Sequence, residues 1–569
     1  MSNISSSLPV STNDAKPNPN FTRRTANYHP NVWGDYFLSY DTSFEEANDQ
    51  DKQFQLLKEG LRKVLVSSTD KNFSFTLNFI DSIQRIGVSY HFQHEIDGVL
   101  LEIYEISTKD NNIIVLEDDL HQLALLFRLL RQQGYHISPT DVFYKFKDQT
   151  GNFNETLAND IQGMMSLYEA SQLRIHGEEI LEEAYKFTHV QLTKSLTTQL
   201  SPFLAAQVNH ILGQSLHKGI PRLEARHYMS FYEEDPSHDE NLLTFAKLDF
   251  NMLQKLHRKE LSDVTKWWIK DLNVPSKLPF VRDRIVEGCI WTLGVYFEPQ
   301  YSLARKIIMK VGSIITIMDD VYDAYGTIHE LEVFTNAIES RWDICCLVDL
   351  PEYMKFCYTT ILNVFEEIEK EMNKQGKAYY IEYAKKEMKR LAQAQMTEAR
   401  WLHCNHTPTI NEYMQVATVS IGYPVLIIIS FIGIEDTTEE ILIWATSHPN
   451  ILIAALTISR FMDDIAGNEY EQERGHVASS IECYMMQHNT SKQDAIDQLL
   501  KKVDSAWKDI NEACLSPTQA PSTILMPIVN LTRVMDVFYK DKDIYTHSEG
   551  KMKDYIEALL VNKIPVYIP

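Results

Sequence analysis

Glycine is scarce in this chain, at 20 of 569 residues. Proteins rich in strands and tight turns use roughly twice that proportion. Apolar residues still make up 44% of the sequence, which is enough for a large core. Apolar residues also recur at helical spacing, for example at Ile361, Phe365, Ile368 and Met372. The composition therefore favours an all-α protein, and the length predicts two large domains.

The chain also lacks the marks of export and of membrane insertion. Its 7 cysteines form no Cys-x-x-Cys pair, and an odd number without regular spacing indicates a reducing compartment. The most apolar run, residues 425–434, is too short to cross a bilayer. No apolar signal core and no arginine precede Arg23, which argues against a signal or transit peptide. We expect a cytoplasmic protein with no transmembrane segment.

A surplus of basic residues is missing as well. The formal net charge is −24, so the chain has no excess of cations with which to neutralise nucleic-acid phosphates. We expect no nucleic-acid partner. A small anionic substrate stays compatible with this charge, because bound metal ions can invert the local sign.

The organisation along the chain predicts a tail and two helical domains. Residues 1–22 read as a disordered tail. The polar, proline-containing segment 232–240 is the best candidate for a linker. We therefore predict an N-terminal helical domain over residues 23–240 and a C-terminal domain over residues 241–569, which holds nearly every chemically informative cluster.

Two acidic clusters each follow a long apolar run. The first contains Asp319, Asp320 and Asp323, and the second extends from Asp463 to Glu471. Carboxylates are costly beside buried apolar surface unless cations compensate them. If the runs are helices, the acids lie in their last turns, where the helix dipole also disfavours negative charge. The pattern predicts bound cations.

Helical spacing places these acids on common faces. Asp319 and Asp323 are four residues apart, and Asp463, Gly467 and Glu471 form a stripe at the same interval. Carboxylate oxygens that leave coordination positions open suit Mg²⁺, which usually binds through one or two carboxylates together with substrate phosphates. A solvated helix end would explain either cluster alone, but it explains two matching clusters poorly.

Arginines and an aromatic residue accompany the acids. Arg282 and Arg284 precede the first cluster, Arg460 lies three residues before Asp463, and Trp291 follows in an apolar stretch. Taken singly, Arg282 and Arg284 are equally typical of surface ion pairs, and Trp291 is more typical of core packing. Together they suit a diphosphate leaving group beside a carbocation, because guanidinium groups bind phosphate and aromatic faces stabilise cations.

Four motifs in this order resemble those of plant class I terpene synthases, particularly the cytosolic sesquiterpene synthases. They are Arg23-Arg24-x8-Trp33, Arg282-Asp283-Arg284, the DDxxD motif Asp319 to Asp323, and the second metal motif Asp463 to Glu471. The resemblance extends from about residue 23 to the C-terminus. It implies an all-α, two-domain fold, with a C-terminal class I isoprenoid-synthase bundle and an N-terminal relic α-barrel domain.

The resemblance also implies the roles of individual residues. Three Mg²⁺ ions, with Mn²⁺ as a substitute, would be held by Asp319, Asp320, Asp323, Asp463, Gly467 and Glu471. The diphosphate would be bound by Arg282, Arg284 and Arg460, and the hydrocarbon pocket would be lined by Trp291, Tyr423 and Tyr545. Asp543 would lie on a capping loop, and the segment 23–33 would fold over the closed site.

Two positions depart from the family pattern. Gly467 stands where the family usually has serine or threonine, so we expect water in place of a hydroxyl ligand and a higher Mg²⁺ requirement. Phe538 stands where some relatives carry tyrosine. In addition, Gly422 and Pro424 predict a helix break, with an ordinary loop as the alternative. The resemblance implies that the carbonyls at this break face the pocket.

These observations predict a monomeric sesquiterpene synthase. Its small-molecule substrate would be farnesyl diphosphate, and its products diphosphate and an olefin or alcohol. A monoterpene synthase using geranyl diphosphate is the nearest alternative, favoured by the complete Arg-Arg-x8-Trp motif and opposed by the short N-terminus. A prenyl-chain elongase would need a second true DDxxD, which Gly467 interrupts. A catalytically silent helical scaffold is the remaining alternative.

Overall fold

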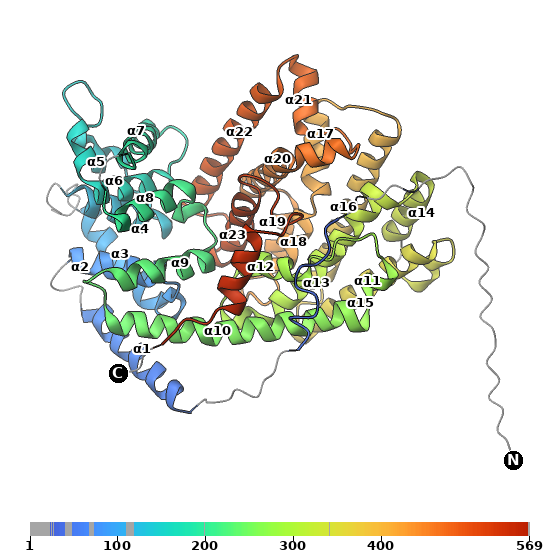
Figure 1. The fold of residues 1–569 in the computed structure, drawn as a ribbon, viewed down its shortest axis with the longest axis horizontal. Coiled ribbons are helices and arrows are strands. Elements are labelled where there is room, and N and C mark those ends of the chain that lie inside the picture. Colours follow the sequence, from blue (N-terminus) through green and yellow to red (C-terminus); the bar gives the residue numbers. More distant parts are fainter. Residues whose placement is uncertain are drawn as a thin grey trace.

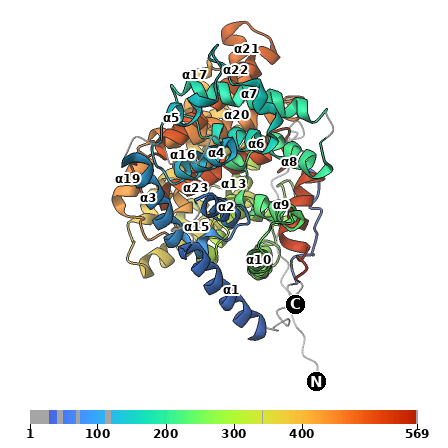
Figure 2. The ribbon, with the colours of Figure 1, turned by 90° about the vertical axis from the view of Figure 1, so that its left-hand side faces the viewer.

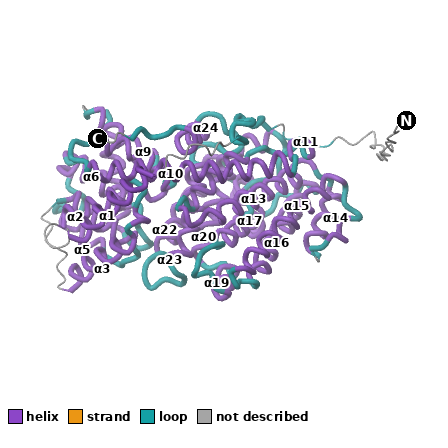
Figure 3. The backbone as a smooth tube through the Cα atoms, turned by 90° about the horizontal axis from the view of Figure 1, so that it is seen from below, coloured by secondary structure: helices purple, strands orange, loops and turns teal. Residues whose placement is uncertain are grey.

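The computed structural model describes most of the chain. The described residues are 23, 26, 28–39, 48–67, 73–109, 119–197, 200–340 and 342–566. These residues form helices and no strand, apart from one isolated bridge between Lys147 and Phe153 (Figure 3). The predicted all-α class is confirmed. The predicted tail, residues 1–22, and Arg24 lie outside the described residues.

The helices of residues 48–234 gather on one side of the molecule (Figures 1 and 2). They are α1 (Asn48–Ser67), α2 (Phe73–Arg85), α3 (Gln93–Lys109), α4 (Leu120–Gln132), α5 (Pro139–Phe143), α6 (Ile161–Ser171), α7 (Glu179–Ser195), α8 (Pro202–Gly213) and α9 (Pro221–Glu234). In α4 the leucines are buried, and the equally buried Arg128 and Arg131 pair with Asp81 and Glu178. These ion pairs compensate the buried charge that helix packing imposes.

The second half of the chain forms a larger helical bundle. Its helices are α10 (Glu240–Lys266), α11 (Val274–Lys277), α12 (Ile285–Val295), α13 (Ser302–Asp320), α14 (Ile328–Glu339), α15 (Glu352–Lys374), α16 (Tyr380–His403), α17 (Ile410–Ser420), α18 (Tyr423–Ser430), α19 (Glu439–Thr446), α20 (Asn450–Glu473), α21 (Ser480–His488), α22 (Lys492–Ala513), α23 (Ser522–Phe538) and α24 (Lys551–Ile556). The helix predicted around Ile361 to Met372 is α15, and all four predicted positions are buried.

Short 3₁₀ and π segments connect these helices. They are η1 (Ser89–His91), η2 (Tyr144–Phe146), η3 (Glu155–Asn159), η4 (Leu216–Lys218), η5 (Trp267–Asp271), η6 (Pro299–Tyr301), η7 (Val321–Tyr325), η8 (Ile344–Leu347) and η9 (Glu557–Val561). Helix α13 continues directly into the π turn η7. It packs among α10, α12, α15 and α18, which places its acidic end inside the bundle.

The predicted linker is a short connection between α9 and α10. The backbone N–H of Asp239 donates to the Tyr232 hydroxyl, and the Asp239 side chain caps α10 by accepting from the Leu242 N–H at 2.9 Å. The predicted domain boundary at residue 240 is therefore the first residue of α10. The division of the chain into domains at this point stays a prediction.

The predicted helix break is present between α17 and α18, whose axes differ by 41°. Gly422 adopts φ of 80°, a left-handed conformation that residues with a side chain rarely adopt. A Cβ atom there would also lie 2.6 Å from the Ile315 side chain of α13. Glycine is therefore required both by the turn and by the close approach of α13.

Among the described residues, no single helix is both long and apolar enough to cross a membrane. Two bent pairs, α17 with α18 and α19 with α20, reach the required length and composition only when their helices are taken together.

We expect Gly422→Ala to destabilise the protein by about 1–3 kcal/mol, because it combines backbone strain with overpacking against Ile315. Thermal unfolding followed by circular dichroism measures the effect. Gly98→Ala in α3 is the matched control, since no atom lies within 4 Å of its added Cβ atom. Equal unfolding midpoints for Gly422→Ala and the wild type would contradict this account of the break.

Candidate active site

A cavity of about 310 Å³ lies within the C-terminal bundle, lined by residues of α12, α13, α17, α18, α20 and α23. It brings together most of the predicted site residues: Arg282, Trp291, Asp319, Asp323, Tyr423, Arg460, Asp463, Gly467, Glu471, Asp543 and Tyr545. Asp320 and Arg284 are not among the lining residues. Polar side chains occupy one end of the cavity and aromatic rings another.

The end of α13 supplies the first group of carboxylates. Asp319 is within the last turn of the helix, as predicted, and Asp323 follows on the π turn η7. Asp320 is fully buried, forms an ion pair with the Arg282 guanidinium at 2.9 Å and accepts the Arg282 backbone N–H at 2.7 Å. Asp320 therefore holds the Arg282 loop in place beside the cavity.

Helix α20 supplies the second group. Asp463, Gly467 and Glu471 share one face, as their spacing predicts, and Glu471 lies near the helix end. The prediction that these acids occupy the last turn is wrong for Asp463, because α20 continues to Glu473. The helix extends through the acidic segment since its polar residues are compatible with helical structure.

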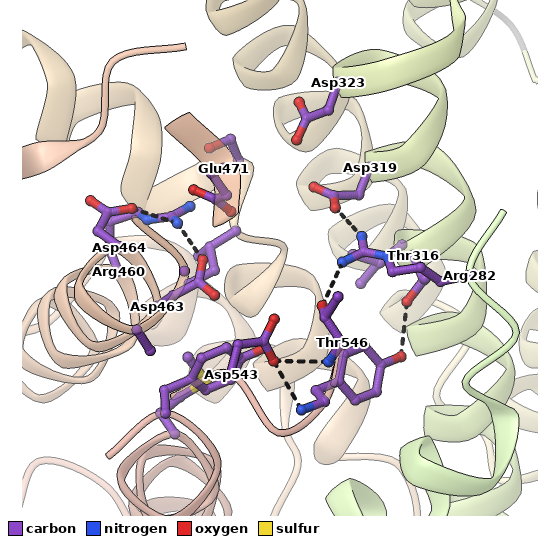
Figure 4. Close-up of a pocket in the computed structure, with 18 of the residues that line it drawn as sticks. Arg282, Thr316, Asp319, Asp323, Arg460, Asp463, Asp464, Glu471, Asp543 and Thr546 are labelled. Carbon is purple, nitrogen blue, oxygen red and sulfur yellow. Dashed lines mark hydrogen bonds and ion pairs between the residues drawn. The ribbon is translucent and has the colours of Figure 1, made fainter. Parts of the chain in front are cut away.

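The two groups face each other across the cavity (Figure 4). Burial raises the pKa values of Asp319, Asp463 and Glu471, and repulsion from neighbouring carboxylates raises them further. The Arg282 guanidinium contacts Asp319, and Arg460 contacts Asp463. Each cluster thus combines carboxylates that favour a bound cation with an arginine that can bind an anion.

His476 joins the two clusters. Its Nε2 lies 2.9 Å from Asp323 and its Nδ1 lies 3.8 Å from Glu471. Burial lowers the pKa of His476, but the two carboxylates outweigh burial and raise it to about 10. Burial raises the pKa of Asp323, but the charge and hydrogen bond of His476 together with the charges of Arg474 and Arg282 outweigh it, so the net shift is downward.

Arg284 has a structural environment that differs from the predicted one. Its side chain is buried and donates to the carbonyl oxygens of His29, Asp283, Tyr545 and Thr546 at 2.9–3.1 Å. These bonds tie the Arg282 loop to the segment that follows α23 and to the N-terminal segment. In this structure Arg284 orders the rim of the site and does not face the cavity.

Aromatic rings form the apolar part of the cavity. Trp291 meets Tyr545 and Phe538 edge to face with ring centroids 5.3 Å apart, and Tyr423 lies at 6.0 Å. The Tyr423 hydroxyl donates to the Leu531 carbonyl at 3.1 Å, so a backbone group satisfies the polar end of this side chain. This arrangement presents aromatic surface suited to a carbocation.

Asp543 lies on the predicted capping loop after α23. Its carboxylate accepts the backbone N–H groups of Tyr545 and Thr546, each at 2.9 Å. Asp543 therefore shapes the turn that carries the Tyr545 ring into the cavity. The Tyr545 hydroxyl in turn lies 3.1 Å from the Thr316 hydroxyl of α13.

Several lining residues were missed by sequence reasoning. They include Tyr28, Glu398, Tyr413, Asp464, Arg474 and His476. Burial raises the pKa of Glu398 to about 8, and the Ser420 hydroxyl donates to its carboxylate at 2.7 Å. Arg474 and His476 carried a usable signal because they closely follow Glu471, and Asp464 and Tyr28 did because they lie within the second acidic cluster and the segment 23–33.

The donor set of the two carboxylate clusters fits Mg²⁺. Within the described part of the chain, no three or more His, Cys, Asp and Glu side chains by themselves form a metal-binding group. Mg²⁺ is commonly bound by one or two carboxylates and completes its shell with water and phosphate oxygens. The paired carboxylates on each wall satisfy that requirement, whereas Gly467 contributes no side-chain oxygen.

We expect Gly467→Ser to lower the Mg²⁺ concentration that gives half of the maximal metal-induced rise in unfolding temperature. The hydroxyl adds an oxygen beside Glu471, whose carboxyl carbon lies 3.2 Å from the position of an added Cβ. Gly467→Ala is the matched control, since it adds the Cβ without the oxygen. An unchanged requirement in Gly467→Ser would mean that water already fills this ligand position adequately.

Two family models match the chain. The model described as "Terpene synthase, N-terminal domain" matches residues 32–212. The model described as "Terpene synthase family, metal binding domain" matches residues 270–509, which include both carboxylate clusters.

Similar proteins cover nearly the whole chain. A (-)-germacrene D synthase from Vitis vinifera is 50% identical over 96% of this chain and 97% of its own. Sesquiterpene synthase 2 from Toona sinensis is 47% identical with the same coverage.

Solved structures agree with this likeness. Grey poplar isoprene synthase, in complex with three Mg²⁺ ions and dimethylallyl-S-thiolodiphosphate, is 33% identical with a TM-score of 0.85, covering 91% of this chain and 97% of that one. Limonene synthase with 2-fluorolinalyl diphosphate is 30% identical with a TM-score of 0.90, covering 96% and 100%. From the matching family models and full-length relatives we conclude that this chain belongs to the terpene synthase family.

Proposed function

We propose that this protein is a sesquiterpene synthase that converts farnesyl diphosphate into diphosphate and a sesquiterpene. The observation that carries the proposal is one cavity that joins two facing carboxylate clusters to an aromatic pocket. Full-length relatives named as sesquiterpene synthases support the fifteen-carbon substrate.

The polar end of the cavity suits the diphosphate. Arg282 and Arg460 lie on opposite walls, so their guanidinium groups can bind the two phosphates of one substrate. Bound Mg²⁺ would supply further neutralisation of the charge that develops on the departing oxygens. We propose Asp319 and Asp323 as ligands on one wall and Asp463 and Glu471 on the other, for three ions, with Mn²⁺ as a substitute.

The aromatic end suits the hydrocarbon chain and the cation that ionisation leaves. The rings of Trp291, Tyr423 and Tyr545 converge there, and an aromatic face stabilises a cation without providing a nucleophile. Phe538, whose ring centroid lies 5.3 Å from that of Trp291, is fully buried and is not among the residues that line the cavity. A closed site that excludes water lets the cation cyclise before it is quenched.

A monoterpene synthase that uses geranyl diphosphate is the second candidate. The complete Arg-Arg-x8-Trp segment favours it, and so does the fold that this chain shares with limonene synthase. The sesquiterpene synthases resemble the chain more closely in sequence, which favours farnesyl diphosphate. We further propose that the enzyme acts as a monomer in the cytoplasm.

The direct test incubates purified protein with farnesyl or geranyl diphosphate, with and without Mg²⁺, and identifies products by gas chromatography–mass spectrometry. Fifteen-carbon products that require Mg²⁺ would support the proposal. Products from geranyl diphosphate alone would establish the monoterpene alternative. Absence of product from both substrates would return the silent scaffold to consideration.

We expect Asp319→Ala and Asp323→Ala to reduce diphosphate release from farnesyl diphosphate at least about 100-fold. Loss of a charged ligand acts on the ionisation step itself, where electrostatic stabilisation is largest. A coupled colorimetric assay measures the release. Glu366→Gln is the control, since this acid lies on α15 with a side chain that is 60% exposed. Near-normal release by either aspartate variant would refute the metal-ligand assignment.

A further inference from the structure

Arg474 is a cation of the cavity that the sequence motifs do not contain. It follows the last residue of α20 and lines the same cavity as Arg282 and Arg460. Burial raises the pKa values of Asp319 on the opposite wall and of Glu471 on its own, and the charge of Arg474 opposes that rise. The same charge contributes to the net lowering of the Asp323 pKa. Arg474 therefore lies within electrostatic reach of both carboxylate clusters.

Tyr28 of the N-terminal segment contacts this arginine directly. Arg474 Nη1 donates to the Tyr28 hydroxyl at 2.9 Å, and the Arg474 guanidinium carbon is 5.7 Å from the Tyr28 ring centroid. The guanidinium carbon of Arg282 lies 4.9 Å from the same ring. One phenol ring thus contacts a cation from each wall of the cavity.

The chain around Tyr28 is held in place by both walls. The Tyr470 hydroxyl donates to the Ala26 carbonyl at 2.9 Å, and Arg284 donates to the His29 carbonyl at the same distance. The Asn31 amide donates to the Asp283 carboxylate at 3.0 Å. This dark blue segment lies over the C-terminal helices in Figure 1.

A further contact anchors the start of the segment. Arg23 donates to both carboxylate oxygens of Glu330 at 2.7 and 2.9 Å and to the Tyr325 carbonyl at 3.1 Å. Glu330 also belongs to the capping box of α14, so its position is fixed independently of Arg23. Tyr28 is therefore flanked by anchored residues on both sides.

We propose that Arg474 is a diphosphate-binding residue and that Tyr28 is its positioning residue, so that docking of the N-terminal segment and binding of diphosphate favour each other. Arg284 is engaged by four backbone carbonyls, which leaves Arg282, Arg460 and Arg474 as the arginines among the residues that line the cavity. A guanidinium held by a hydrogen bond and ring contacts loses less freedom when it binds phosphate.

The proposed coupling between Tyr28 and Arg474 can be tested by a double-mutant cycle. If Tyr28 acts through Arg474, removing its hydroxyl weakens diphosphate binding only while Arg474 is present. The inference rests on the proposed function, because it assigns residues to the diphosphate of that substrate. Inorganic pyrophosphate with Mg²⁺ serves as the probe, since it carries the phosphates without the hydrocarbon.

The experiment titrates pyrophosphate into the full-length protein at fixed Mg²⁺ concentration by isothermal calorimetry. We expect Arg474→Ala to weaken binding about tenfold or more, as loss of a charge-assisted hydrogen bond does, and Arg474→Lys to weaken it less. We expect Tyr28→Phe to weaken it about fivefold in the wild type, and to have no further effect when combined with Arg474→Ala.

Tyr36→Phe is the matched control, because Tyr36 lies on the same segment with 48% of its surface exposed. It should bind pyrophosphate as the wild type does. Thermal unfolding midpoints identify variants that fail to fold. If Arg474→Ala is one of them, Arg474→Lys replaces it in the double-mutant comparison. A purely structural role for Tyr28 would lower the unfolding midpoint and would leave the two effects additive.

Wild-type affinity for pyrophosphate in Arg474→Ala would overturn the inference. If Arg474→Ala does not fold, wild-type affinity in Arg474→Lys together with additive effects of Tyr28→Phe would overturn it. The proposed function fails by a different result, namely absence of product from farnesyl diphosphate in the wild type. A wild-type enzyme that makes a sesquiterpene while both variants bind pyrophosphate normally would refute this inference alone.

Discussion

Negative charge held against apolar surface is the constraint on which the site depends. Asp319, Asp463 and Glu471 line a cavity whose other end is aromatic, and burial raises their pKa values. Arg282 offsets part of this charge by pairing with Asp319, and Arg460 does so by pairing with Asp463 on the opposite wall. The remaining negative potential favours divalent cations, and the arginines favour an anion beside them, so the site is complementary to a metal diphosphate.

Helix ends and loops around the cavity serve this arrangement. The turn of α13 into η7 carries Asp323, and the break at Gly422 lets α17 and α18 pass α13 closely. Arg284 binds carbonyls of two distant segments and joins the rim of the site to the N-terminal chain. The site therefore depends on backbone contacts from distant parts of the sequence as much as on its charged side chains.

Much of the site was predictable because helical spacing and local charge are readable from sequence. The faces shared by Asp319 with Asp323 and by Asp463 with Glu471 follow from periodicity, and Gly422 marked the helix break. The inward position of Glu398 was not predictable, because it depends on how α16 packs against α17 and α18. Arg284 was assigned to the diphosphate on its motif alone, whereas the carbonyls that it binds become neighbours only in the folded chain.

The central claim is that the two carboxylate clusters bind one metal diphosphate between them. A crystal of the protein grown with Mn²⁺ and pyrophosphate, measured at a wavelength where manganese scatters anomalously, tests this claim most directly. We predict anomalous peaks at both Asp319–Asp323 and Asp463–Glu471, bridged by a single pyrophosphate in contact with Arg282 and Arg460. Manganese at one cluster only, or pyrophosphate bound away from both, would contradict the account.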